Sequence, residues 1–233
     1  MKAFLLAAGH GTRLRPLTDH TPKCLLPIRG VPLLGIWLQI CAALGIDEVL
    51  INIHYRADQV REFLNQRDPH PKVIVVEEKE LLGSGGTLRA NQKWVAGEDL
   101  FWVFYADVLN SNDLHSMMDA HRRSSPAVTL GVYRVPDPSR CGIVELSADN
   151  VVERFVEKPR QPASDLAFSG IMIGTPAFLE AIPPGKSDIG YDVLPKLGGQ
   201  MIAYPITGYL LDIGTMDNYE QAQITWPGLP LPV

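Results

Sequence analysis

The stretch Leu5-Leu6-Ala7-Ala8-Gly9-His10-Gly11-Thr12-Arg13-Leu14-Arg15-Pro16-Leu17 decides how the rest of the chain is interpreted. An apolar run from Ala3 to Ala8 predicts a buried strand, and glycines follow it. Glycines leave backbone N–H groups open to close approach by an anion. Three cations come next, at Arg13, Arg15 and Lys23. Backbone donors followed by cations indicate a loop that wraps a polyphosphate.

This loop differs from the two commonest phosphate-binding loops. A dinucleotide-binding fingerprint requires a third glycine where this chain has Leu14. A Walker A loop requires a Gly-Lys-Ser/Thr triplet, which the chain lacks. A Rossmann oxidoreductase is therefore disfavoured. On the glycines alone, a Gly-rich turn with solvated arginines remains the alternative, because such turns are common.

The composition is typical of a globular protein. The chain has 233 residues, of which 46% are hydrophobic and 20% charged. The net charge is −5 and there is no basic tract, so we expect no nucleic-acid partner. The early apolar run is too short for a signal peptide or a membrane span. Cys24, Cys41 and Cys141 show no metal-ligand spacing, and we expect a cytoplasmic protein with no membrane contact.

Predicted strands and helices alternate along the first half, which indicates a parallel sheet covered on both faces. The expected strands are 2–7, 48–53, 72–76, 100–105 and 127–132, and the expected helices 33–44, 57–64, 88–94 and 112–121. The second half predicts a hairpin (142–146 and 151–156), strands at 166–173, 202–205 and 209–211, helices at 175–181 and 190–197, and a last helix capped by Thr215. We expect one α/β domain at 1–225, with a nucleotide half at about 1–125, a sugar half at about 126–225, and a Pro-rich tail at 226–233.

Two carboxylates follow predicted strands. Asp107 comes after Tyr105-Ala106, and Asp212 comes after Tyr209-Leu210-Leu211. A lone aspartate there is usually a turn or cap residue. However, ligands of open α/β sheets bind beyond the carboxyl ends of the strands, where the polyphosphate loop also lies. Two carboxylates beside phosphates suit Mg²⁺, which takes one or two carboxylates together with phosphate oxygens.

The complete pattern LAAGxGTRLxPLT, followed by PKxLLP, resembles the signature of the nucleotidyltransferases that join a sugar 1-phosphate to a nucleoside triphosphate. Every fixed position is matched, and the resemblance covers Met1 to about Glu220. It implies a three-layer αβα, Rossmann-like, doubly wound fold with a mixed, mainly parallel sheet. It also implies that an NTP and a sugar 1-phosphate react to give an NDP-sugar and pyrophosphate.

The resemblance assigns residues to roles. The implied catalytic residues are Arg13, Lys23, Asp107 and Asp212, of which the two aspartates hold Mg²⁺. The implied nucleotide-binding residues are Leu6, Ala7, Ala8, Gly9, Gly11, Thr12, Arg13, Lys23, Glu78, Gly83 and Asp107. One departure is Ala106, where the family usually has glycine.

A second motif, Val156-Glu157-Lys158-Pro159, resembles the EKP motif of the family. Taken alone, it would be a surface ion pair of little energetic value. By resemblance, Glu157 accepts hydrogen bonds from sugar hydroxyls and Lys158 binds the sugar phosphate. The resemblance also implies that Gly142 and Ser169 contact the sugar. Phe168 stands where most relatives have asparagine, which leaves the sugar open.

The segment Glu78–Thr87 resembles the base-recognition segment of the family. Relatives that read uracil or thymine commonly have glutamine where this chain has Glu78. A carboxylate only accepts hydrogen bonds, which suits the N1–H and N2–H₂ groups of guanine. We therefore expect GTP, with UTP second. The LGxxG form of Leu82–Gly86 also resembles mannose-1-phosphate guanylyltransferases, which implies mannose 1-phosphate or a related heptose-type sugar 1-phosphate.

Two alternatives remain open at the level of sequence. N-acetylmuramate-1-phosphate uridylyltransferases use UTP and share the triplet Phe168-Ser169-Gly170, but they usually lack the EKP motif. A regulatory module could bind a sugar nucleotide without turnover, but such modules tend to have lost loop cations or metal carboxylates. We expect a monomer or a small homo-oligomer.

Overall fold

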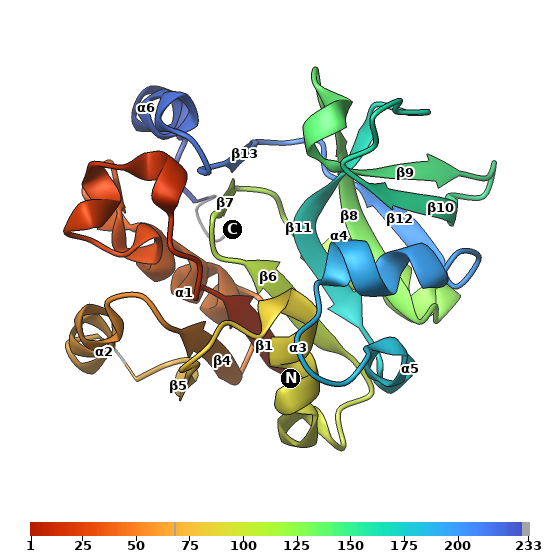
Figure 1. Cartoon of the computed structure of the whole chain (residues 1–233). Helices are drawn as coiled ribbons and strands as arrows, with labels where there is room; N and C mark the ends of the chain where they lie inside the picture. The colour runs from red at the N-terminus through yellow and green to blue at the C-terminus, as the bar shows by residue number, and fades with distance from the viewer. Residues whose placement is uncertain (68, 230–233) are drawn as a thin grey trace. The chain divides into compact units, whose positions relative to one another are not determined.

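The computed structural model describes residues 1–67 and 69–229, in which helices and strands alternate (Figure 1). The chain divides into two units, which are described separately. Unit 1 comprises Met1–Leu81, Phe104–Asp113 and Gly208–Val233, and unit 2 comprises Leu82–Val103 and Leu114–Thr207. The single domain at 1–225 stays a prediction. Of the expected tail, residues 230–233 lie outside the described residues.

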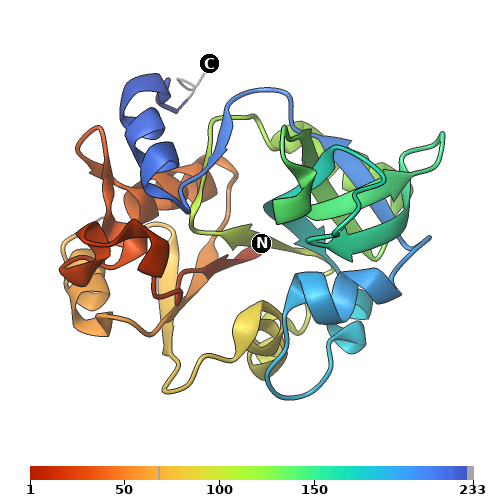
Figure 2. The same cartoon turned by 45° about the horizontal axis from the view of Figure 1, so that its top comes forward.

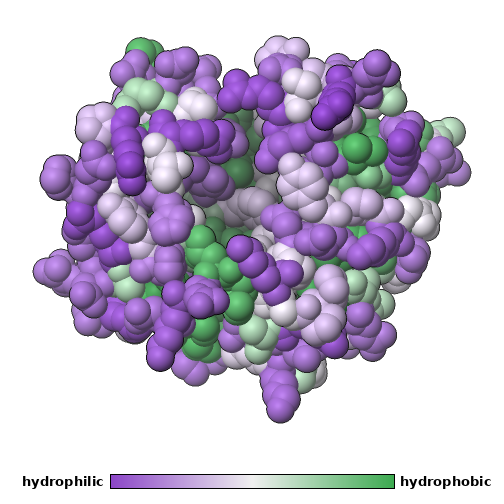
Figure 3. Space-filling view, in the orientation of Figure 1, coloured by the Kyte–Doolittle hydropathy of each residue, from purple (hydrophilic) through white to green (hydrophobic). Residues whose placement is uncertain are grey.

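Unit 1 contains a sheet in the order β5-β4-β1-β6, in which β5, β4 and β1 run parallel. Its strands are β1 (Lys2–Leu6), β2 (Pro27–Ile28), β3 (Val31–Pro32), β4 (Glu48–Ile53), β5 (Lys72–Glu77), β7 (Val108–Asn110), β13 (Leu210–Asp212) and the end of β6 (Phe101–Tyr105), and its helices are α1 (Leu33–Ala43), α2 (Ala57–Asn65) and α6 (Met216–Thr225). The sheet strands read as apolar runs because both faces of a parallel sheet are covered. Hydrophilic residues cover most of the face drawn in Figure 3, whereas large side chains such as Trp37 and Phe4 are fully buried.

Helix α1 holds the segment that follows β6. The ring of Trp37 stacks on Phe104 with a centroid distance of 4.7 Å, and its Nε1 donates to the carbonyl oxygen of Val108 at 2.8 Å. Val108 begins β7, a strand that the sequence analysis did not predict. β7 pairs antiparallel with β13, which sets Val108 opposite Asp212. Two segments far apart in the sequence therefore share one short ladder.

The β2–β3 hairpin clamps the C-terminal end of α6. Arg29 donates from Nη1 to the carbonyl oxygen of Trp226 at 2.9 Å and from Nε to that of Gln223 at 3.2 Å. At the other end, the hydroxyl of Thr215 accepts from the N–H of Asn218, which confirms the predicted N-cap. At each end of α6, side chains therefore form hydrogen bonds with backbone groups that have no partner within the helix.

Arg29→Ala is expected to lower the free energy of unfolding by about 1–2 kcal/mol, because the last carbonyls of α6 lose a charged donor. Urea unfolding followed by circular dichroism measures this change. The matched control is Arg154→Ala, whose ion pair with Glu145 lies on the surface and is expected to matter by less than about 0.5 kcal/mol. Equal losses of unfolding free energy in the two variants would contradict a stabilising role of Arg29 at the end of α6.

Unit 2 contains a mixed sheet in the order β11-β8-β12-β10-β9, in which β9 also pairs with β11. Its strands are β8 (Val128–Arg134), β9 (Gly142–Leu146), β10 (Val151–Glu157), β11 (Leu166–Gly174), β12 (Met201–Pro205) and the start of β6, and its helices are α3 (Gly83–Ala90), α4 (His115–Ser124) and α5 (Pro176–Ala181). β8 and β12 run parallel, and the other pairs of this sheet are antiparallel. The predicted hairpin is confirmed as β9–β10, with Asn150 in its turn at φ +60° (green in Figure 2).

Some helix predictions were wrong in position or type. The helix expected at 88–94 is α3, which begins at Gly83 and contains the glycines that were expected to precede it. A Cβ atom on Gly83 would lie 2.4 Å from the carbonyl oxygen of Ser187, and one on Gly86 would lie 2.7 Å from that of Gly185. The glycines therefore serve close packing, which overrides their low helix propensity.

Two further helices differ from the prediction. The helix expected at 112–121 is α4, which begins at His115 and ends at Ser124. The helix expected at 190–197 is one π-helical turn (Ile189–Val193) followed by a 3₁₀ turn (Leu194–Lys196). Pro195 interrupts it, because proline lacks the N–H that continues a helix. No helix among the described residues is long and apolar enough to cross a membrane.

Candidate active site

The loop after β1 depends on one glycine for its shape. Gly11 adopts φ +65° and ψ +26°, and a Cβ atom there would lie 2.9 Å from Cγ2 of Thr18 and 3.1 Å from Cβ of Lys23. The Thr18 hydroxyl donates to the carbonyl oxygen of Gly11 at 2.9 Å. A Cβ on Gly9, in contrast, would meet no atom within 4 Å. Close packing and the left-handed backbone therefore explain why residue 11 is glycine. Gly9, in contrast, borders open space that a ligand can approach.

The four predicted catalytic residues all lie in unit 1, and the structure groups them. Lys23 donates from Nζ to Oδ2 of Asp107 at 2.7 Å. Nη2 of Arg13 and Oδ1 of Asp212 lie 2.9 Å and 2.5 Å from the point that a Cβ on Gly214 would occupy. Gly214 thus makes room for both side chains. The β7–β13 ladder brings the two aspartates into one cluster with the loop cations.

The electrostatics of this cluster suit a divalent cation. Asp212 is exposed to solvent, yet partial burial among protein atoms raises the pKa of its carboxyl, and the Asp107 carboxylate raises it further. Lys23 and Arg13 act on that pKa in the opposite direction. Among residues 1–67 and 69–229, no group of three or more His, Cys, Asp or Glu side chains could hold a metal. The two carboxylates could supply ligands to a divalent cation, which would take its remaining ligands from phosphate and water oxygens.

Glu78, the predicted base-reading residue, follows β5 and is only 5% exposed. Its Oε1 accepts from Nδ2 of Asn52 at 2.9 Å, and Nδ1 of His54 lies 2.7 Å from its carbonyl oxygen. Asn52 was not among the residues predicted from the sequence. An amide within the apolar run of β4 was the signal that could have identified it, because a buried polar side chain needs partners.

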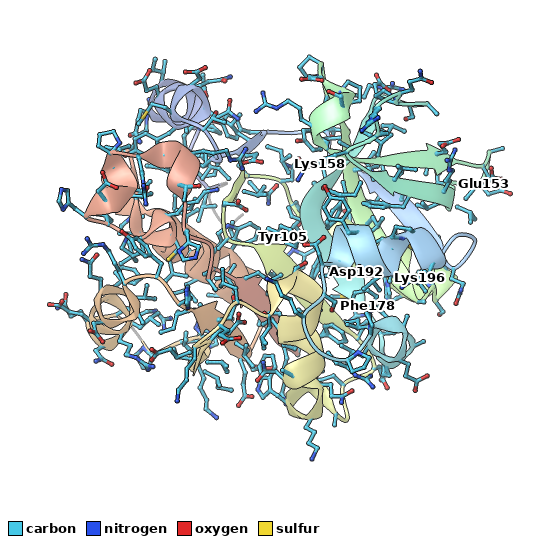
Figure 4. All side chains as sticks on the ribbon, viewed as in Figure 1. Tyr105, Glu153, Lys158, Phe178, Asp192 and Lys196 are labelled. Carbon is cyan, nitrogen blue, oxygen red and sulfur yellow. The ribbon has the colours of Figure 1, made fainter. Side chains whose placement is uncertain are left out.

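A second cluster lies in unit 2, at the end of β10. Oε2 of Glu157 lies 2.6 Å from the point that a Cβ on Gly142 would occupy, and 2.5 Å from that of Gly190. Lys158 has φ +47°, and its Nζ lies 3.5 Å from Oε1 of Glu157 and 5.7 Å from the ring centroid of Tyr191 (Lys158 is labelled in Figure 4). The structure brings together Gly142, Glu157 and Lys158, which are all predicted to bind the sugar, and places Gly190 and Tyr191 beside them.

Burial raises the pKa of the Glu157 carboxyl, Lys158 lowers it, and Asp188 raises it. Asp188 also shapes the π-helical turn, because its Oδ1 accepts from the N–H groups of Gly190 and Tyr191. Its Oδ2 accepts from the hydroxyl of Ser84 in α3. Asp188 was not predicted from the sequence, and its contact with Ser84 joins residues that are far apart in the chain.

Two further predicted residues, Gly83 and Ser169, have structural contacts within unit 2. Gly83 packs on Ser187, as described above. Ser169 is buried, and its hydroxyl accepts from the N–H of Ile171 at 3.3 Å, within an irregular part of β11. Their predicted contacts with base and sugar remain predictions.

Comparison with known proteins agrees with the motifs. The family model described as nucleotidyl transferase matches residues 2–226, almost the whole chain. The chain belongs to the nucleotidyl transferase family. Members of this family generally use a divalent metal, in agreement with the paired aspartates.

Individual nucleotidyl transferases extend this comparison. The chain is 31% identical over 94% of its length to a mannose-1-phosphate guanylyltransferase catalytic subunit beta from Xenopus tropicalis, and 31% identical over 94% to mannose-1-phosphate guanylyltransferase 1 from Arabidopsis thaliana. It spans 62% and 63% of the length of these two relatives.

A solved structure also matches. HddC from Yersinia pseudotuberculosis, crystallised with GMP-PN, matches 97% of this chain with a TM-score of 0.81 at 26% identity, over 99% of its own chain. The predicted α/β fold of the nucleotide-diphospho-sugar transferase type is thereby confirmed. The cytoplasmic location and the oligomeric state remain predictions.

Proposed function

We propose that this protein transfers a nucleotidyl group from an NTP to a sugar 1-phosphate, with release of pyrophosphate. GTP is the proposed donor, and mannose 1-phosphate or a heptose-type sugar 1-phosphate the proposed acceptor. The observation that carries the proposal is the cluster of Arg13, Lys23, Asp107 and Asp212 beside the glycine-rich loop. The names of the guanylyltransferase relatives support the choice of donor and sugar.

The proposed chemistry needs no protein nucleophile. An oxygen of the sugar phosphate attacks the α-phosphorus in line, and the bond to the bridging oxygen breaks, so that pyrophosphate leaves with the electron pair. Catalysis of this kind rests on positioning and on charge stabilisation. Arg13 stabilises the charge that develops on the leaving pyrophosphate, and Lys23 binds the phosphates. Asp107 and Asp212 hold Mg²⁺, which when bound supplies further neutralisation of phosphate charge.

In unit 2, Lys158 is proposed to bind the phosphate of the sugar and Glu157 to accept hydrogen bonds from its hydroxyls. Support comes from the glycines at 142 and 190, which leave space for the Glu157 carboxylate where any side chain would collide with it. The left-handed backbone of Lys158 is uncommon for a residue with a side chain, and such conformations often occur at functional positions.

Lys158→Ala is expected to raise KM for the sugar 1-phosphate about 10- to 100-fold, because a charged hydrogen bond to phosphate is worth about 1.5–3 kcal/mol. Steady-state kinetics with each substrate varied in turn measures this change. KM for the nucleotide is expected to stay nearly the same. The matched control is Lys196→Ala, which removes an exposed lysine of the same unit (Figure 4). Equal loss of affinity for both substrates would contradict the assignment.

The proposed function is tested by measuring pyrophosphate release with four NTPs and a set of sugar 1-phosphates, with Mg²⁺ and with EDTA. The expected result is fastest release with GTP and mannose 1-phosphate or a related sugar, and none in EDTA. Fastest release with UTP and N-acetylmuramate 1-phosphate would instead establish the uridylyltransferase alternative. Binding of a sugar nucleotide without pyrophosphate release would establish the regulatory module.

A further inference from the structure

The strands β1, β4 and β5 are neighbours in the sheet (Figure 1). One side chain, Asn52 in β4, joins their ends. Oδ1 of Asn52 accepts from the N–H of Ala7, in the phosphate loop, at 2.8 Å. Nδ2 of the same amide donates to Oε1 of Glu78 at 2.9 Å. Asn52 and Glu78 are each 5% exposed. The amide therefore connects the loop predicted to bind phosphate with the side chain predicted to read the base.

The chemistry of the partners fixes which way this amide faces. A backbone N–H can only donate, so the atom of Asn52 that faces Ala7 has to be the acceptor Oδ1. Nδ2 then faces residue 78 and donates, so residue 78 has to present an acceptor to it. A reversed amide would set two donors against each other at Ala7 and leave a buried donor unpaired, which costs about 1–3 kcal/mol.

We propose that Asn52 is a positioning residue that decides which hydrogen-bonding group residue 78 offers to the nucleotide base. The inference rests on the proposed function and on the prediction from the sequence that Glu78 reads the base. A glutamate satisfies Asn52 with one oxygen and has a second oxygen that is also an acceptor. A glutamine at 78 has only one acceptor, which Asn52 takes, so its NH₂ group replaces the second oxygen. The pair of residues 52 and 78, and not residue 78 alone, then sets the base preference.

A set of variants tests this pairing, and its double variant keeps the charge of the wild type. In Glu78→Gln, the group offered to the base changes from an acceptor to a donor, so the ratio of kcat/KM for GTP over UTP is expected to fall about 10- to 100-fold. In the double variant Asn52→Asp with Glu78→Gln, one aspartate oxygen still accepts from Ala7 and the other accepts from the glutamine NH₂. The glutamine oxygen then replaces the second carboxylate oxygen of Glu78, as an acceptor.

The double variant is therefore expected to recover most of the preference for GTP, although residue 78 is still glutamine. A role of Asn52 in folding alone would not restore a base preference. The single variant Asn52→Asp sets two acceptors against each other and is expected to bind both nucleotides more weakly. Equal GTP-to-UTP ratios in Glu78→Gln and in the double variant would overturn the inference.

A second readout separates this inference from the proposed function. Displacement of a fluorescent nucleotide analogue by GTP or UTP gives the same ratio as binding constants, with no need for turnover. Absence of pyrophosphate release with an intact pattern of binding ratios would contradict only the proposed function. Hydrogen exchange of the Ala7 amide tests the premise: we expect faster exchange in Asn52→Leu, which keeps the shape but not the acceptor. Unchanged exchange at Ala7 would overturn the inference by itself.

Discussion

Asp107→Asn and Asp212→Asn are each expected to lower kcat by at least about 10²-fold while the protein stays folded, on the scale of removing one group that stabilises transition-state charge. Asparagine keeps the size of the side chain but has one oxygen and no charge, so the proposed Mg²⁺ site loses a hard anionic ligand. Folding is expected to tolerate Asp212→Asn well, because burial and Asp107 already disfavour the ionised carboxyl of Asp212.

Pyrophosphate release at a series of Mg²⁺ concentrations measures the effect, and circular dichroism checks the fold. Asp217→Asn is the matched control, because Asp217 is exposed in the first turn of α6 in the same unit. Its activity is expected to equal that of the wild type. Full activity of either site variant, or of the wild type in EDTA, would contradict the metal assignment.

Arg13→Ala is expected to lower kcat by about 10²–10³-fold and to raise KM for the nucleotide much less. The reason is that the charge on the leaving pyrophosphate grows in the transition state, so the lost interaction is stronger there than in the ground state. The position of Arg13 next to Asp212 and Gly214 supports this role, because it lies among the other predicted catalytic groups.

The control is Arg15→Ala, which removes a neighbouring arginine of the same loop. Arg15 is 66% exposed and pairs with Asp19 at 3.2 Å, so its loss is expected to change kcat only slightly. Steady-state kinetics and thermal unfolding of both variants make the comparison. A normal kcat with weaker nucleotide binding in Arg13→Ala would show that Arg13 only tethers the substrate.

Local patterns predicted much of the fold. The strand ends at 48 and 53 agree with β4, and the hairpin expected from 142–146 and 151–156 and the cap at Thr215 are confirmed. These features depend on a few consecutive residues, whose alternation or capping chemistry can be read directly. The predicted start of α3 was wrong because its glycines pack closely against Ser187 and Gly185, which are distant in the sequence.

The sequence by itself determined the chemical groups of this protein: a glycine-rich loop, its cations, and carboxylates that follow strands. These are encoded in short motifs because each needs neighbouring residues of fixed type. Only the tertiary structure decided which groups meet. The β7–β13 ladder sets Val108 opposite Asp212, and one amide at Asn52 links Ala7 to Glu78. Such contacts form between segments far apart in the chain, and hydrogen bonding and packing between strands select them, so no local pattern records them.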